Sequence, residues 1–155
     1  MRKRKSLESI SVTALCKAAG VNKSTFYAHF QDIYDLTDKL ETKIIQDIIS
    51  LVDLPDDVAV NGQVATEAVF NAYLANAEIV NIVFTGSRAA LLPQKTEAVL
   101  KETIYSIHPE YREDLEINVM LSMMIYGGFY AFKTNDAYDA KKVVEIIGRY
   151  NTKIR

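Results

Sequence analysis

The segment from Ser11 to Phe30, SVTALCKAAGVNKSTFYAHF, limits the possible folds more than any other part of this chain. Ser11 is a good N-cap, and apolar residues recur after it at helical spacing. Gly20 stands where a helix can end in a left-handed residue, a conformation that is costly for a residue with a Cβ atom. Asn22 can cap a second helix almost at once. The segment therefore predicts two short helices joined by a tight turn, which is the helix-turn-helix pattern.

The second helix of this pattern, Lys23 to Phe30, has an apolar side and a polar side. Phe26 and Phe30 are four residues apart, so they lie on one side and are expected to face the core. The other positions are Lys23, Ser24, Thr25, Tyr27, Ala28 and His29. Most of these are hydrogen-bond donors of modest size, which suit phosphate oxygens and base edges. An ordinary solvent-facing side of a small helix explains the same residues, so both interpretations stay open.

The segment ISVTALCKAAGVNKSTFYAHFQDIYDL resembles the DNA-binding segment of TetR-like (TetR/AcrR) transcriptional regulators. The matching features are Ile10-Ser11-Val12, Ala19-Gly20-Val21, Ser24-Thr25-Phe26-Tyr27, His29-Phe30 and the capping residue Asp32. The remainder of the chain is similar to the family only in its architecture. The resemblance implies a transcriptional regulator, with repression as its expected activity, that binds a palindromic double-stranded DNA operator as a homodimer.

The resemblance also implies roles for individual residues. Lys23 and Thr25 are the candidates for contacts with base edges. Ser24, Tyr27 and His29 are the candidates for phosphate contacts, and Ser11 and Thr13 can reach the DNA backbone from the first helix.

Two features depart from the family pattern. Members of the family carry a further helix before the segment matched by residues 5–10, whereas only Met1 to Arg4 precede it here. We therefore expect the true start of the protein to lie upstream. The alternative is that this form is a ligand-sensing or protein-binding helical dimer that does not bind DNA. Ile33 also stands where family members often have a lysine, so one backbone contact is expected to be missing.

Charge divides the chain into a basic start and an acidic remainder. Residues 1–30 carry six basic residues and one acidic residue, a net charge of +5, and the rest carries 12 basic and 19 acidic residues, a net charge of −7. This asymmetry is typical of a nucleic-acid binder with a separate second module. The cluster from Arg2 to Lys5 either touches DNA or forms a solvated tail.

Composition favours an all-α fold. Apolar residues make up 49% of the chain, which excludes a disordered protein, and no stretch alternates cleanly with a period of two. The single cysteine, Cys16, is expected to be a buried structural thiol. Because we find no signal peptide and no apolar run near the length of a membrane helix, about 18 residues, we expect a cytoplasmic protein without a membrane partner.

We expect two domains. Residues 1–52 form a three-helix-type DNA-binding head, including a connecting helix over residues 33–52 that buries a stripe of Leu36, Leu40, Ile44 and Ile48. Residues 53–155 form a helical effector-binding and dimerisation body, which begins with a connector rich in turn residues. Its helices are expected at about Val64 to Ala75, Ile79 to Phe84, Ala89 to Ile107, Glu110 to Lys133 and Tyr138 to Tyr150.

The segment from Met120 to Phe132 is apolar on nearly every side, so we expect its own body and a partner to cover it together. Gly127 and Gly128 each cost about 1 kcal/mol of helix stability relative to Ala, and close approach of another backbone is the expected compensation. The resemblance implies that the last two helices pair with their twofold mates in a four-helix bundle. The expected interface residues are Met124, Gly127, Gly128, Tyr130, Val143 and Ile147.

A small-molecule effector, unknown in identity, is a further expected partner. Tyr73, Thr85, Arg88, Tyr105 and Tyr126, with Asn81 and Asn118, are the candidates for its pocket. Each of them can equally be a surface residue or a satisfied core residue, and the body can also bind nothing small.

The sequence shows no pattern typical of an enzyme. We find no metal-ligand spacing, no glycine-rich phosphate loop and no nucleophile elbow, so we predict no catalytic residue, no metal and no cofactor. His29 and His108 are the only histidines. The position of His29 on the second helix favours phosphate contact over acid–base work, and His108 is more typical of a capping or surface residue.

Overall fold

The structure is a computed structural model that describes residues 2–3 and 5–152, and these residues contain helices and loops but no β-strand. The all-α fold predicted from the sequence is therefore confirmed. The elements are η1 (Leu7–Ser9), α1 (Val12–Ala19), α2 (Lys23–His29), α3 (Ile33–Ile49), α4 (Gly62–Ala75), α5 (Ala77–Val83), η2 (Gly86–Ala90), α6 (Leu91–Ile107), η3 (Pro109–Arg112), α7 (Leu115–Thr134) and α8 (Ala140–Asn151).

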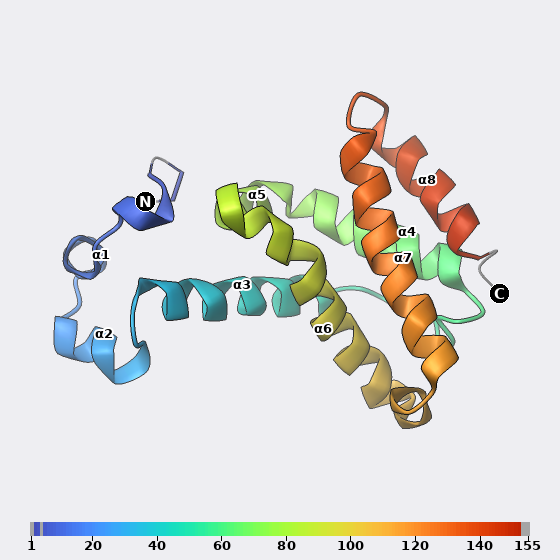
Figure 1. The fold of residues 1–155 in the computed structure, drawn as a ribbon, viewed down its shortest axis with the longest axis horizontal. Helices are drawn as coiled ribbons and strands as arrows, with labels where there is room; N and C mark the ends of the chain where they lie inside the picture. The colour runs from blue at the N-terminus through green and yellow to red at the C-terminus, as the bar shows by residue number, and fades with distance from the viewer. Residues whose placement is uncertain (1, 4, 153–155) are drawn as a thin grey trace.

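The first three elements lie at one end of α3, and the later helices gather around its other end (Figure 1). We call η1, α1 and α2 the head, and α4 to α8 the body. Within the body, α8 packs along α4, and α7 contacts both α6 and α8. The long helix α3 carries the head and also packs against α4, α5 and α6.

The buried side of α3 differs from the stripe expected from the sequence. Leu40 is 45% exposed, whereas its neighbour Glu41 is completely buried. Glu41 can lie on the buried side because Arg88 of η2 pairs with its carboxylate. The end of α3 does bury apolar residues, because Ile45, Ile48 and Ile49 pack with residues of α5 and α6 in one core cluster. The final turn of the connecting helix therefore belongs to the core of the body.

Two boundaries predicted for the body helices are wrong. The expected helix from Ala89 begins as the 3-10 turn η2, and α6 starts at Leu91 with Pro93 in its first turn. The expected helix from Glu110 is divided, because Pro109 opens the short η3 and α7 begins only at Leu115. Asp114 caps α7 by accepting a hydrogen bond from the Ile117 N–H at 3.0 Å.

The close backbone contact expected at Gly127 and Gly128 lies elsewhere. A Cβ atom on Gly62 would stand 3.1 Å from the Asn151 carbonyl oxygen, and one on Gly148 would stand 3.3 Å from the Gln63 carbonyl oxygen. These glycines allow α4 and α8 to approach each other. Gly128 instead faces the Phe70 ring, and a Cβ built on Gly127 would meet no described atom within 4 Å outside its chain neighbours and its own helix backbone.

The connector between α3 and α4 is fastened to η3 by polar contacts. His108 bonds through Nε2 to the carbonyl oxygen of Asp56 and lies 3.1 Å from Glu110 through Nδ1. Its ring stacks on Tyr111 at a centroid distance of 4.7 Å, and the Tyr111 hydroxyl donates to Asp57 at 3.2 Å. Since both ring nitrogens of His108 face oxygen acceptors, the protonated imidazolium satisfies both contacts.

These contacts predict a pH dependence of stability. The hydrogen bond to the Asp56 carbonyl, followed by the one to Glu110, raises the pKa of His108 above its ordinary value of 6.5, and the charge of Asp57 adds to this. A raised folded-state pKa gives stability that is fully present below about pH 6.5 and is lost as the pH rises through the folded-state pKa. Thermal unfolding should therefore show the melting temperature of the wild-type protein falling toward that of His108→Gln between about pH 6 and about pH 8. A difference between the two melting temperatures that stays constant or grows over this range would contradict this role of His108.

Candidate nucleic-acid interface

The two helices of the head begin and end largely as the sequence predicts. The Ser11 hydroxyl oxygen accepts a hydrogen bond from the Ala14 N–H at 3.1 Å, which caps α1. Gly20 ends α1 in the left-handed region with φ of 69°. Asn22 occupies the N-cap position of α2, but its side chain makes no capping hydrogen bond to the described backbone. The turn of Gly20, Val21 and Asn22 fixes the orientation of α2 relative to α1.

One side of α2 is held by a small apolar core. Phe26 is only 5% exposed, and its ring contacts Tyr27 edge-on and Phe30 at a tilt. The other buried residues of the head are Leu7, Ile10 and Cys16. Cys16 is thus the buried thiol that the sequence predicts.

The other side of α2 is open to solvent. Lys23, Ser24, Thr25, Tyr27 and His29 are all exposed, and so are Ser11 and Thr13 at the start of α1. Tyr27 exposes 56% of its surface although it is aromatic. The side chains predicted to contact DNA therefore lie on the surface of the head, at the end of the molecule farthest from α7 and α8 (Figure 1).

The end of α2 is tied to the start of α3. The Lys39 ammonium donates to the His29 carbonyl oxygen at 3.2 Å, pairs with Asp35 at 3.0 Å, and lies 5.4 Å from the centre of the Phe30 ring. The Gln31 N–H also donates to Asp35 at 2.9 Å. This N–H, followed by Lys39, lowers the pKa of Asp35. These contacts make the orientation of α2 depend on α3.

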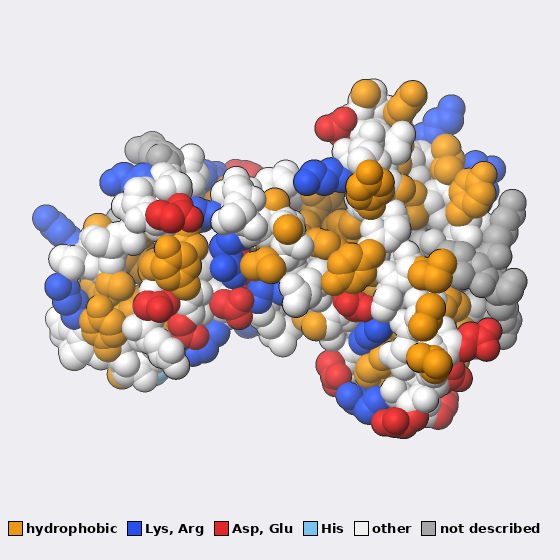
Figure 2. All heavy atoms as spheres, viewed as in Figure 1, with side chains coloured by type: hydrophobic (Ala, Val, Ile, Leu, Met, Phe, Trp, Pro, Cys, Tyr) orange, Lys and Arg blue, Asp and Glu red, His pale blue; other side chains and the backbone are white. Residues whose placement is uncertain are grey.

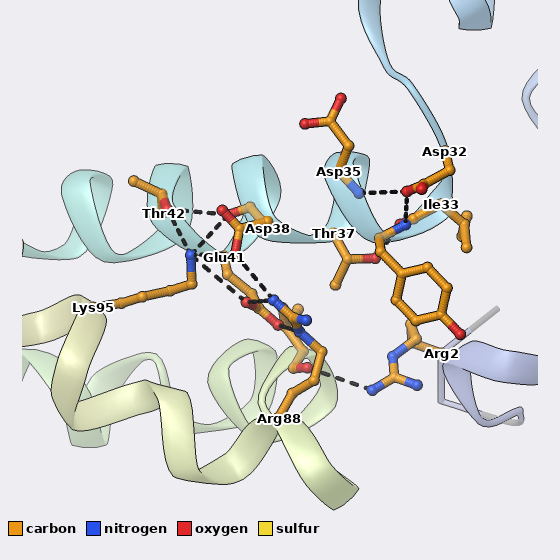
Figure 3. A network of polar contacts seen from close by, with 12 residues as sticks. Arg2, Asp32, Ile33, Asp35, Thr37, Asp38, Glu41, Thr42, Arg88 and Lys95 are labelled. Atoms are coloured by element: carbon orange, nitrogen blue, oxygen red, sulfur yellow. Dashed lines mark hydrogen bonds and ion pairs between the residues drawn. The ribbon is translucent and has the colours of Figure 1, made fainter.

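A charged cluster joins α3 to η2 and α6, and we call it the α3 charge cluster (Figure 3). Arg88 binds both carboxylate oxygens of the buried Glu41 and also lies 3.2 Å from Asp38. Lys95 of α6 pairs with Asp38 at 2.8 Å and donates to the Thr42 hydroxyl at 3.0 Å. Lys95 is the main cause of a lowered pKa at Asp38, and the hydrogen bond to Glu41 is the main cause of a raised pKa at Arg88. The cluster fixes η2 and the start of α6 against the middle of the helix that carries the head.

The basic residues at the start of the chain point toward the body. An Arg2 guanidinium nitrogen lies 3.5 Å from the Val83 carbonyl oxygen, and Lys3 pairs with the exposed Glu78. Arg2 and Lys3 are therefore neither free in a solvated tail nor placed beside α2. Arg4, in the same predicted cluster, lies outside the described residues.

The residues expected to line an effector pocket do not converge on one site. Thr85 and Arg88 border a groove beside the N-terminal segment, and Arg88 is engaged by Glu41. Tyr105 donates to Asn118 at the far end of α6, and Asn81 and Tyr126 are exposed. Only Tyr73 lines an internal cavity, beside Phe129. In the described residues, Thr85 and Arg88 therefore line a different hollow from Tyr73.

Four of the six residues expected in the dimer interface are buried in the body itself. Met124, Gly128, Val143 and Ile147 are each less than a tenth exposed, because they pack against α4 and the connector. Tyr130 and Gly127 do face solvent.

An exposed apolar stripe runs along α7, and of its residues the sequence analysis expected only Tyr130 in an interface. Its residues recur every three or four positions and are Leu115, Val119, Met123, Tyr126 and Tyr130, with exposed fractions from 42% to 78%. Figure 2 shows hydrophobic side chains aligned over α7. Because nearly every position of this helix is apolar, periodicity could not separate its inner side from its outer side.

Helix α7 also corrects the expectation that no segment is long and apolar enough to span a membrane. It has 20 residues and an 18-residue window with a mean hydropathy of 1.3. The core helix of a soluble protein passes the same test, so length and composition alone are weak evidence for a membrane span.

Comparisons of the chain with protein-family models, with curated proteins and with solved structures find no match. Among the described residues, no three histidine, cysteine, aspartate or glutamate side chains are grouped so that they could hold a metal ion. The geometry of the head and body is therefore the basis for any functional conclusion.

Proposed function

We propose that this protein is a DNA-binding transcriptional regulator of the TetR-like type, a repressor that binds a palindromic operator as a homodimer. The observation that carries the proposal is the exposed polar side of α2. Its five candidate side chains are open to solvent, while Phe26 on the opposite side anchors the helix in the head. The order of a capped helix, a glycine turn and a second helix agrees with a helix-turn-helix.

The chemistry of this side suits duplex DNA. Lys23 lies in the first turn of α2, where the free N–H groups and the positive end of the helix dipole also favour phosphate. The hydroxyl groups of Ser24, Thr25 and Tyr27 donate and accept hydrogen bonds, so they can bind phosphate oxygens or base edges. The basic side chains of Lys17 and Lys23 are both exposed on the head.

The α7 stripe supports the homodimer. An exposed apolar surface that follows one side of a 20-residue helix is typical of a surface that a partner covers. A second copy of the same helix, related by a twofold axis, presents the same stripe to the first. The proposal requires the two heads of such a dimer to lie in successive major grooves, about 34–36 Å apart.

Sedimentation equilibrium tests the dimer. We expect the wild-type protein to be a dimer at micromolar concentration and Met123→Asp to be a monomer, because a carboxylate in the middle of the stripe would lose its hydration in the interface. Ser122→Asp is not a suitable control, because the Ser122 hydroxyl bonds to Glu97 and Lys101 and its loss would also disturb contacts within the protomer. Glu145→Asp changes an exposed residue of α8 and should leave the dimer intact. A wild-type monomer at this concentration would remove the dimer from the proposal.

Two single substitutions test the roles of the side chains on α2. Tyr27→Ala should weaken binding to every duplex alike, because a phosphate contact carries no sequence information. Thr25→Ala should instead lower the discrimination at one base pair by about 1 kcal/mol, the contribution of a single neutral hydrogen bond. Fluorescence anisotropy with a selected operator and with a scrambled duplex measures both effects. Equal losses on the two duplexes for both variants would contradict these assignments.

A further inference from the structure

We propose that the groove between the N-terminal segment, residues up to Glu8, and η2 binds a small molecule that carries a phosphate group. We call it the junction groove, because it lies where the start of the head meets the body. Three properties support this ligand: the volume of the groove, the charges in its walls and the loose attachment of Arg2. Any effect of the ligand on DNA binding rests on the proposed function, but its binding does not.

The junction groove is large enough for a phosphate with an organic part. Its volume is about 360 Å³, and sites for small molecules commonly have about 300–1,000 Å³. Two segments that are far apart in the sequence form its walls. The charged residues in these walls are Arg2, Lys5, Glu8 and Arg88, and the hydroxyl groups include those of Thr85 and Ser87.

The charges in the walls favour an anion. Three of the lining side chains are cationic, whereas Glu8 is the one lining carboxylate among the described residues. Arg88 is held by Glu41, so Arg2 and Lys5 are the cations that a ligand can recruit. Figure 3 shows Arg2 and Arg88 on the same side of α3. Because like charges around one hollow repel each other, an anion between them is favourable.

Arg2 is attached only loosely to the body. Its guanidinium nitrogen lies 3.5 Å from the Val83 carbonyl oxygen, which is the outer limit for a hydrogen bond. Its Nε atom is buried without a hydrogen-bond partner among the described residues. A guanidinium has five N–H donors in a planar fork that matches two oxygens of a phosphate. A small movement of the Arg2 side chain can therefore turn unused donors toward an anion in the groove.

A tetrahedral anion suits the groove better than a planar one, because the donors come from two segments. Arg2 and Lys5 belong to the N-terminal segment, and the hydroxyl groups of Thr85 and Ser87 belong to the region of η2. A phosphate monoester has three acceptor oxygens and about 1.5–2 negative charges at pH 7. A carboxylate has two oxygens and one charge. A phosphate group can thus bond to both segments at once and so hold the head against the body.

A nuclear magnetic resonance titration of the full chain with inorganic phosphate tests this site without DNA. The isotope-labelled protein is titrated at constant pH and ionic strength, and acetate serves as the planar anion for comparison. We expect phosphate to shift the amide signals of residues 5–8 and 85–88 saturably. Acetate should bind there much more weakly, because it offers fewer oxygens and less charge.

Three substitutions separate the groove from its surroundings. Lys5→Gln should weaken phosphate binding by about 2- to 5-fold, the contribution of one exposed charge pair, and Glu8→Gln should strengthen it by a similar factor. Lys3→Gln is the matched control, because it removes the same charge from the same segment. Since Lys3 pairs with Glu78 and lines neighbouring hollows instead, this variant should bind phosphate as the wild type does.

The proposal is overturned if the shifts do not saturate, if acetate binds as tightly as phosphate, if Lys5→Gln weakens binding no more than Lys3→Gln, or if Glu8→Gln does not strengthen it. Lys23→Gln tests the other candidate position for phosphate, the start of α2, and should leave the shifts unchanged. Shifts confined to α2 that disappear in Lys23→Gln would overturn the groove but not the proposed function. Saturable binding in the groove by a protein that binds no DNA would instead contradict only the proposed function.

Discussion

Replacing Arg88 by methionine should lower the free energy of unfolding by about 3–5 kcal/mol, because it leaves the carboxylate of Glu41 buried without its main partner. Glu41 is completely buried, and the Arg88 side chain is 16% exposed. Lys95 lies 3.9 Å from Glu41, too far for a hydrogen bond, and is already bonded to Asp38. Urea denaturation followed by circular dichroism measures the loss.

Two control variants test whether the loss of stability comes from the unpaired buried charge. Lys43→Met removes the partner of Asp47 in a pair whose side chains are 65% and 60% exposed, so it should cost less than about 1 kcal/mol. The double variant Arg88→Met, Glu41→Leu replaces both buried charges by apolar groups and should recover most of the stability. An Arg88→Met protein as stable as Lys43→Met would show that the α3 charge cluster does not hold the body against α3.

Replacing Phe26 by alanine should unfold the head while the body stays folded. The expected cost is about 3–5 kcal/mol, since a buried aromatic side chain is lost from a core of few residues. The buried apolar side chains of the head other than Phe26 are Leu7, Ile10 and Cys16, so little remains to hold α1 and α2 in place. Hydrogen exchange should show lost protection in residues 7–30 and retained protection in α4 and α8, together with lost DNA binding.

Tyr27→Ala is the matched control for Phe26→Ala. Tyr27 is adjacent to Phe26 and is 56% exposed, so its removal should leave protection in the head unchanged although it weakens DNA binding. Loss of protection throughout the chain in Phe26→Ala would mean that the head and body unfold as one unit. Full protection in the head would mean that Phe26 does not hold it together.

Local signals in the sequence were sufficient to predict much of the head. Ser11, Gly20 and Asp32 act at helix ends as predicted, because capping and left-handed turns depend on a few neighbouring residues. The polar side of α2 was also predictable, since Phe26 and Phe30 define the opposite side. Whether that side binds DNA stays a prediction.

The body was harder to predict because its contacts join distant residues. Nothing near Glu41 in the sequence indicates that Arg88, 47 positions later, will bury it. The apolar residues of α7 occur on every side, so the sequence could not show that Met124 faces inward while Met123 faces solvent. The interface and pocket residues expected from the sequence were therefore largely misplaced, although a long apolar helix was expected in the right region.

The central claim is that the exposed side of α2 binds duplex DNA, and a selection from randomised duplexes followed by binding measurements across salt concentrations tests it most directly. We predict enrichment of a palindrome with half-sites about 10 base pairs apart, and an affinity that falls steeply with salt as phosphate contacts release counterions. Lys23→Gln should weaken binding to the palindrome, because Lys23 is a candidate for contacts with base edges. A selection that enriches no palindrome, with an affinity that does not change with salt or with Lys23→Gln, would contradict the account.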